Sequence, residues 1–359
     1  MNTTWHVLDS LNQGLHQAMA ADPRVYLLGE DVLDPYGGAF KVTRGLSSTF
    51  PERVWATPIS EAGITGVAAG MALRGLLPVV EIMFGDFMTL AADQLTNHIA
   101  KFPWMYSGGK TSEQQVEVPL VIRTPMGGRR GYGPTHSQTL EKLFLGLPGL
   151  HVVSPTCLAL DEASSPGGLL QQAILADRSP VLFVENKLLY LQPLLDQASL
   201  TEWQVEQNPA AVADLTSGGP VYPTFTLRLR GAPSPSLTLT AYGYMAEISR
   251  QAALRLAYEY EIFCELVFPT CLAPFDLEAL RASISRTRRL VTVEEGTLSM
   301  GWGAEIIARS VEGTGSLPLA ARRVAALEYP IPASGSLEAV VLPGVEQVIK
   351  QCLEFNQNG

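Results

Sequence analysis

The sequence predicts an α/β protein made of two doubly wound domains, each with a mostly parallel sheet covered by helices on both faces. Three observations support this fold class. The chain has 359 residues, a length typical of two domains. Apolar residues make up 47% of it, which is enough for two cores. Short apolar runs that fit strands alternate with longer segments of helical period, a pattern typical of parallel sheets.

The first predicted domain spans residues 1–191. Its opening helix is indicated by apolar residues at helical spacing, namely Trp5, Leu8, Leu11, Leu15 and Met19. The predicted strands that follow are RVYLLGED, PVVEIMF, VPLVIRTP, HVVSPT and PVLFVEN. The predicted helices between them are residues 61–75, GDFMTLAADQLTNHIAKFPWM, TLEKLFLGL and GGLLQQAILAD. Two glycine-rich segments, YGGAFKVTRGL and GGRRGYGPTHSQ, are predicted to be loops.

Residues 192–236 break this alternation. The segments QNPAAVADLTSGGPVYP and RGAPSPS are rich in Pro, Gly and Ser, so we predict a linker with some ordered pieces. A second domain is predicted over residues 237–359. Its strands are LTLTAYG, IFCELVF, RLVTVEE and RRVAALE, and its helices are MAEISRQAALRLAYEY, DLEALRASISR, GWGAEIIARS and LPGVEQVIKQCLEF.

Composition limits the possible partners. The net charge of −10 argues against nucleic acid or a membrane surface. Only 17% of the residues are charged, which suggests that much of the surface is buried against another subunit. The four cysteines are scattered, no apolar run is long enough to span a bilayer, and the N-terminus lacks the basic region of a signal peptide. We therefore expect a reduced, cytoplasmic protein without a zinc site.

Glu61 stands out in the segment TPISEAGITGVAAGMAL because small and aliphatic residues surround it. A glutamate in a first helical turn, capped by Ser60 or Thr57, can simply favour the helix dipole. The small residues that follow, however, let another surface approach the backbone closely. A carboxylate at the edge of such a contact loses water, which raises its pKa unless a partner hydrogen-bonds it. That setting suits proton exchange with a heterocyclic ring.

Other residues have an ordinary and a functional interpretation. Met83, Phe87 and Leu90 lie on or just after the strand that follows the Glu61 helix, and taken alone they are core residues. His136 lies in a loop, where a histidine is usually solvated, although such loops also carry sites and imidazole titrates near neutral pH. Arg129 either solvates or orders this loop, or it binds a substrate carboxylate. The same alternatives hold for Arg130.

Several segments occur in an order that resembles a known family. They are GEDV, YGGAFKVTRGL, TPISEAGITGVAAGMALRGLLPVVEI, ADQLTN, GYGPTHSQTLEKLF, LPGLHVVSPT and PVLFVENKLLY, followed by RLVTVEEGTLSMGWGAEIIARS and LPGVEQVIKQ. Together they are similar to the β subunit of the thiamine-diphosphate-dependent dehydrogenase component of 2-oxo acid dehydrogenase complexes. The resemblance covers essentially the whole chain. It implies a transketolase-like pyrimidine-binding domain followed by a transketolase C-terminal domain.

The resemblance assigns roles to particular residues. It implies that Glu61 shares a proton with the aminopyrimidine ring of thiamine diphosphate, which then serves as an electron sink for decarboxylation. Met83 and Phe87 occupy positions that contact the pyrimidine. His136 occupies the position of a histidine that faces the reacting atoms and takes part in acyl transfer to the lipoyl group. Glu30 lies where the family has a residue near the cofactor interface.

The resemblance implies two further points about ions and partners. Asp177 aligns with a position near a structural monovalent-cation site in some members. The chain has no Gly-Asp-Gly pattern of the kind that binds Mg²⁺ and the diphosphate in this superfamily. We therefore expect an α subunit to supply that end of the site, in an α2β2 heterotetramer that acts on a 2-oxo acid and attaches to a lipoyl acyltransferase core.

One segment departs from the family pattern. ELVFPTCLAPFD, with Phe268, Pro269 and Thr270, stands where many members read Asp-Leu-Arg-Thr. This change leaves attachment to a standard lipoyl complex open. Two alternatives to the dehydrogenase therefore remain: a thiamine-diphosphate-dependent carboligase or acyl-transfer subunit of specialised metabolism, and a non-catalytic interaction protein on the same fold.

Overall fold

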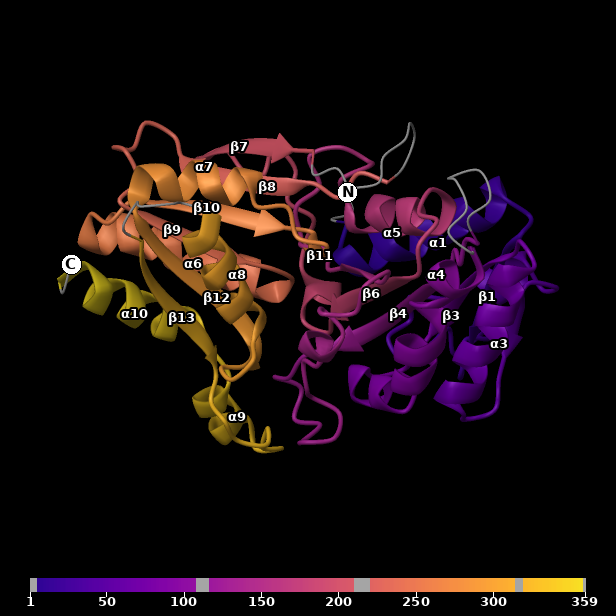
Figure 1. Cartoon of the computed structure of the whole chain (residues 1–359). Coiled ribbons are helices and arrows are strands. Elements are labelled where there is room, and N and C mark those ends of the chain that lie inside the picture. Colours follow the sequence, from indigo (N-terminus) through magenta and orange to yellow (C-terminus); the bar gives the residue numbers. More distant parts are fainter. Residues whose placement is uncertain (1–4, 108–115, 210–219, 314–318, 358–359) are drawn as a thin grey trace.

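The computed structural model describes residues 5–107, 116–209, 220–313 and 319–357. Two sheets form the two lobes in Figure 1, with the first lobe in indigo to magenta and the second in orange to yellow. Within the described residues, no helix is long and apolar enough to cross a membrane. The predicted α/β class with two sheets is confirmed.

The first sheet has seven strands in the order β11-β5-β6-β4-β3-β1-β2. All neighbours are parallel except β11, which runs antiparallel to β5. The bounds of the strands are β1 Val25–Gly29, β2 Val54–Ala56, β3 Leu77–Glu81, β4 Val121–Met126, β5 His151–Val153, β6 Val181–Asn186 and β11 Cys271–Ala273.

Helices cover both faces of this sheet. Helices α1 (Val7–Ala21) and α5 (Pro166–Leu175) pack on one face, and α3 (Glu61–Leu73) lies on the other. Glycines set the distance between α1 and α5, because a Cβ at Gly167 would lie 1.9 Å from the Ser10 carbonyl oxygen. In addition, the Gly167 N–H donates to Ser10 Oγ over 2.9 Å.

The long helix predicted from Gly85 is broken into pieces. The segment forms the 3-10 helix η1 (Gly85–Thr89), the π-helix η2 (Gln94–Ile99) and the short helix α4 (Phe102–Ser107). The segment is closely packed where it begins, since a Cβ at Gly85 would lie 2.3 Å from the Met126 side chain. The segment TLEKLFLGL, also predicted to be helical, forms only the 3-10 turn η4 (Glu141–Leu143). Helix α2 (Leu46–Thr49) is a single turn.

The second sheet has six strands in the order β13-β12-β9-β10-β8-β7. The four strands from β13 to β10 are parallel, whereas β8 and β7 are antiparallel to their neighbours. The bounds of the strands are β7 Trp203–Asn208, β8 Thr224–Leu229, β9 Leu237–Ala241, β10 Cys264–Pro269, β12 Arg289–Thr297 and β13 Ala320–Ala326. The helices are α6 Tyr244–Tyr260, α7 Glu278–Thr287, α8 Trp302–Gly313, α9 Gly335–Val341 and α10 Val345–Gln357.

The predicted linker, residues 192–236, contributes structure to the second domain. Strands β7 and β8 both lie in it and extend the second sheet beside β10. Alternating residues explain this, because Phe225 and Leu227 on β8 and Trp203 on β7 are buried in the core of the second domain. Conversely, β11 lies in the predicted second domain by sequence but pairs with β5 of the first sheet.

The segment that departs from the family pattern is buried. It consists of Phe268, Pro269 and Thr270. Phe268 lies in the core of the second domain, opposite Phe225 of β8. The Thr270 hydroxyl donates to the Pro223 carbonyl over 2.7 Å, and its own carbonyl accepts from the Ser154 N–H over 2.8 Å. This segment therefore connects the two sheets.

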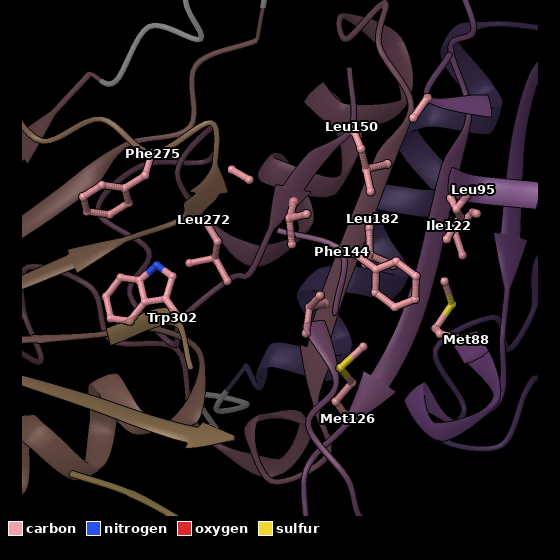
Figure 2. Packing of buried hydrophobic residues seen from close by; sticks show 14 of the residues in the cluster. Met88, Leu95, Ile122, Met126, Phe144, Leu150, Leu182, Leu272, Phe275 and Trp302 are labelled. Carbon is pink, nitrogen blue, oxygen red and sulfur yellow. The ribbon is translucent and has the colours of Figure 1, made fainter. Parts of the chain in front are cut away.

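One apolar cluster continues from the first domain into the second. Figure 2 shows its first-domain part, including Met88, Ile122 and Phe144, and its second-domain part, including Phe275 and Trp302. Because these side chains share one core, the two domains pack directly on each other.

Candidate active site

Four neighbouring parallel strands direct the predicted site residues to the same edge of the first sheet. Glu30 follows β1, and Glu61 begins the helix after β2. Met83 and Phe87 follow β3, and His136 lies in the loop after β4. These strands are adjacent in the order β2-β1-β3-β4. All five residues therefore lie at the carboxyl edge of a parallel sheet, where ligands bind in open α/β folds.

Glu61 is the first residue of α3. Ser60 caps this helix, because its Oγ accepts the Gly63 N–H over 3.3 Å. The Glu61 side chain is only 6% exposed, and no hydrogen bond to its carboxylate is found within the described residues. A largely buried carboxylate at a positive helix end is thus present, with acceptor oxygens available for another molecule.

Glu30 lies beside Glu61. Burial raises the pKa of the Glu30 carboxyl, and the charges of Glu61 and Asp31 raise it further, while a backbone hydrogen bond at Ser60 lowers it. One Glu30 oxygen is buried without a hydrogen-bond partner. The Glu61 carboxylate is therefore close enough to act on the protonation of Glu30 at this edge.

His136 is held among aromatic rings. The Phe84 ring lies 4.9 Å from the imidazole, centroid to centroid, and the Phe87 ring lies 5.2 Å from it, both edge to face. Tyr132 packs in turn on Phe84 at 5.8 Å. On the imidazole, Nδ1 lies 3.0 Å from the Thr135 hydroxyl. The structure thus brings together Phe87 and His136, while Met83 lies half-buried two residues beyond the end of β3.

The His136 loop has the backbone shape that its glycines permit. Gly127, Gly131 and Gly133 all have positive φ. A Cβ at Gly127 would also lie 2.5 Å from the Asn186 side-chain nitrogen, so a side chain there is excluded on two grounds.

Arg129 orders this loop against the second domain. Its N–H donates to Glu338 Oε1 over 2.5 Å, and its guanidinium donates to the carbonyls of Leu342 and Pro343. Arg130 is exposed. The hydrogen bonds of Arg129 thus favour loop ordering over the binding of a substrate carboxylate.

Asp177 lies at the opposite edge of the sheet, just before β6 begins. Its carboxylate accepts from His151 Nδ1 at 2.8 Å, from the Tyr222 hydroxyl at 2.9 Å and from the Ser179 N–H at 3.0 Å. Its carboxylate thus serves as an acceptor for side chains and backbone of this chain, and within the described ranges no group of three or more His, Cys, Asp or Glu side chains can hold a metal. The monovalent cation near Asp177 stays a prediction.

The sequence interpretation missed a buried ionic cluster under the site. Arg123 of β4 pairs with Glu81 of β3 and Glu185 of β6, and the Tyr190 hydroxyl donates to Glu185 over 2.6 Å. The signal was present in the sequence, because Glu81, Arg123 and Glu185 are single charges of alternating sign inside three apolar strands. Also missed were Phe84 and Lys187, which contact His136.

Comparison with known proteins agrees with this architecture. The family model described as the transketolase pyrimidine binding domain matches residues 5–192, and that of the transketolase C-terminal domain matches residues 229–348. A split-gene transketolase in an inactive β4 tetramer has a TM-score of 0.69, with 19% identity and 96% coverage of both chains. That likeness concerns the fold alone.

Relatives of known name are closer in sequence. The pyruvate dehydrogenase E1 component subunit beta-1, mitochondrial, of Arabidopsis thaliana is 36% identical over 96% of this chain and 87% of its own length. The corresponding β subunit of Drosophila melanogaster is 37% identical over 97% of this chain and 88% of its own. The Bos taurus subunit is 35% identical over 96% and 88%. This chain therefore belongs to the transketolase-like family of pyruvate dehydrogenase E1 β subunits.

Proposed function

We propose that this chain is the β subunit of a thiamine-diphosphate-dependent 2-oxo acid dehydrogenase. With an α subunit, in an α2β2 heterotetramer, it decarboxylates a 2-oxo acid and transfers the acyl group to lipoamide on an acyltransferase core. The observation that carries this proposal is the buried Glu61 carboxylate, which begins α3 without a hydrogen-bond partner in the described chain. A pyruvate substrate is favoured by the names of the relatives. The cytoplasmic location stays a prediction, supported by four buried free cysteines.

The described residues fit the pyrimidine end of the cofactor. A ring with nitrogen donors needs an acceptor carboxylate, which Glu61 provides, and aromatic or sulfur contacts, which Phe87 and Met83 provide. Thiamine diphosphate supplies, when bound, the electron sink for decarboxylation. In this proposal the Glu61 carboxylate, which is 6% exposed, accepts a proton from the ring and returns it.

His136 suits a later step at the same edge. With Nδ1 beside the Thr135 hydroxyl and the ring held by Phe84 and Phe87, the imidazole has a fixed orientation. An imidazole exchanges protons near neutral pH, so His136 carries a proton to or from the lipoyl sulfur during acyl transfer.

The side of helix α3 that carries Val67 and Gly70, here called the α3 face, is exposed. This exposure supports the need for an α subunit. Val67 is 56% exposed, and a Cβ at Gly70 would meet no atom within 4 Å. The side chains of this face are small enough for a partner to approach the backbone that carries Glu61. The α subunit would supply the diphosphate and Mg²⁺ end of the site, since this chain has no Gly-Asp-Gly pattern.

A cofactor-binding and activity experiment tests the proposal. We expect no thiamine diphosphate binding by the chain alone in calorimetry with Mg²⁺, and tight binding after addition of the α subunit. Glu61→Gln should lower decarboxylation by about 10²–10⁴-fold, the usual contribution of a general acid–base group, while assembly persists.

The matched control is Glu278→Gln. Glu278 also begins a helix, α7, but it is exposed in the second domain, so its loss changes a helix-end charge without touching the site. Full activity of Glu61→Gln, or tight cofactor binding by the chain alone, would refute the assignment. The product separates the dehydrogenase from a carboligase, because one gives acyl-dihydrolipoamide and the other an acyloin.

A further inference from the structure

Lys187 is a buried cation below the His136 loop. It follows β6 directly, and its side chain is fully buried. Its ammonium donates a hydrogen bond to the His136 backbone carbonyl. No ion pair between Lys187 and a carboxylate is found in the part of the chain that the structure describes.

Two aromatic faces complete the surroundings of this ammonium. Lys187 Nζ lies 5.1 Å from the Phe84 ring centroid and 5.6 Å from that of Tyr132. Both distances fit a cation–π interaction, which is stronger when water is excluded. Phe84 is also the ring closest to the His136 imidazole, at 4.9 Å. Lys187 thus contacts both the backbone of His136 and a ring that holds its side chain.

A structural need alone does not account for a charge here. A buried cation without a carboxylate partner is costly, and a neutral donor could satisfy one carbonyl at lower cost. The Lys187 N–H already fixes the end of β6 by donating to the Met126 carbonyl over 3.0 Å. The backbone of Lys187 thus completes the strand pairing without its side chain, and the side chain contacts the His136 loop.

We propose that Lys187 is a positioning residue that fixes the His136 imidazole for acyl transfer, through the His136 carbonyl and the Phe84 and Tyr132 rings. This inference rests on the proposed function. It concerns the transfer step, since Lys187 contacts the His136 loop and has no described contact with Glu61.

The charge of Lys187 gives the proposal a second, independent readout. Burial lowers the pKa of Lys187 to about 8, while the carboxylates of Asp86, Glu295 and Glu338 oppose this effect and the Arg130 charge adds to it. The ammonium that contacts the two rings is thus present at neutral pH and loses its proton in mildly alkaline solution. An arginine at this position would stay charged.

The test compares Lys187→Met and Lys187→Arg in the complex with the α subunit. Two assays separate the steps: decarboxylation with an artificial electron acceptor, and acyl transfer to a lipoyl domain. Lys187→Met should lower kcat of acyl transfer by about 10- to 100-fold, the effect of a displacement near 1 Å, and change decarboxylation and KM less than about threefold. Lys187→Arg should restore most of the transfer rate and keep it constant above pH 8, where the wild-type rate falls.

Lys142→Met is the matched control. Lys142 also holds distant backbone, donating to the Ser299 carbonyl over 2.7 Å and to Thr297, but it does not contact His136. Its loss should leave both rates near wild type. Hydrogen exchange of residues 127–140 should rise in Lys187→Met and not in Lys142→Met.

The outcomes are distinguishable. A wild-type complex that lacks decarboxylation refutes the proposed function itself. An active wild type, with unchanged transfer and exchange in Lys187→Met, refutes only the role of Lys187. If Lys187→Met does not fold, Lys187→Gln, which is also uncharged but keeps a hydrogen-bond donor, takes its place, and unchanged transfer and exchange in that variant refute the role as well.

Discussion

Two sides of the first domain differ in how completely other parts of this chain cover them. At the seam with the second domain, Glu295 accepts the Gly128 N–H over 2.6 Å and the Asn186 amide over 2.9 Å, and an apolar cluster continues across the boundary (Figure 2). At the α3 face, Ile59 is 82% exposed and Val67 56% exposed. The seam is therefore completed by folding, whereas the α3 face has the character of a surface that is completed by another chain.

The two residues of the proposed chemistry, Glu61 and His136, lie on different sides of the domain. Glu61 begins α3, beside the open face. The loop of His136 faces the closed seam, where Arg129 is fixed by Glu338 of α9. We infer that proton exchange with the cofactor depends on assembly, whereas the position of His136 is already set in the single chain.

A charge on the α3 face should give the largest effect. Val67→Asp should weaken association with the α subunit at least about 30-fold, because an unpaired charge buried at an interface costs about 2–5 kcal/mol. Cofactor binding and activity should be lost with it, and the thermal stability of the chain should stay unchanged. Analytical ultracentrifugation of the mixed subunits measures the association.

Val221→Asp provides the comparison for this substitution. Val221 is also exposed, but it precedes Tyr222, whose hydroxyl donates to Asp177 at the opposite edge of the sheet. It should assemble normally. Normal assembly of Val67→Asp would show that the α subunit does not bind to the α3 face.

Removal of a charge from the ionic cluster under the site should give the next largest effect. Arg123 is buried between Glu81 and Glu185, so Arg123→Met leaves two buried carboxylates without a cation. We expect a loss of about 3–5 kcal/mol in the free energy of unfolding, measured by urea denaturation. The surface pair of the exposed Arg24 and the half-buried Asp22 is the control, and Arg24→Met should cost about 1 kcal/mol or less. Equal effects of the two substitutions would contradict this account of the cluster.

Periodicity and caps predicted much of the first domain. The strands from β1 to β6, except the short β2, were visible as apolar runs, and the start of α3 was visible as Ser60 followed by Glu61. Both signals are local, since they depend on burial of one segment and on the backbone at one helix end. Glu61 could be singled out for the same reason.

Features that depend on distant segments were not predictable in this way. The segment from Gly85 forms separate 3-10, π and α pieces where the local pattern favours one helix, and β8 gains its partner from β10. Lys187 follows an ordinary apolar strand, and only the fold brings its ammonium to the His136 carbonyl. The sequence carries no local trace of such pairings, because the residues that select them are far apart along the chain.

The seam should also respond to pH, with the smallest of these effects. Burial raises the pKa of Glu294 to about 7, and the nearby Glu141 carboxylate adds to this, while the Gly303 N–H and Lys142 oppose it. The folded state therefore binds a proton that the unfolded state has already released above about pH 4.5. Since the folded state binds more protons in this window, the free energy of unfolding should fall as pH rises from about 4.5 to 7, by at most about 3 kcal/mol from this group.

Glu294→Gln isolates this contribution. Glutamine keeps an acceptor for the Gly303 N–H, which donates to Glu294 over 2.9 Å, but it does not titrate. The variant should lose the decline in stability between about pH 4.5 and 7 that the wild type shows in urea denaturation. Identical slopes for the two proteins would mean that Glu294 stays ionised at the seam. In that case the closed side of the first domain would contain a buried charge of its own, as the ionic cluster of Arg123 does, and the two regions would be stabilised by the same kind of interaction.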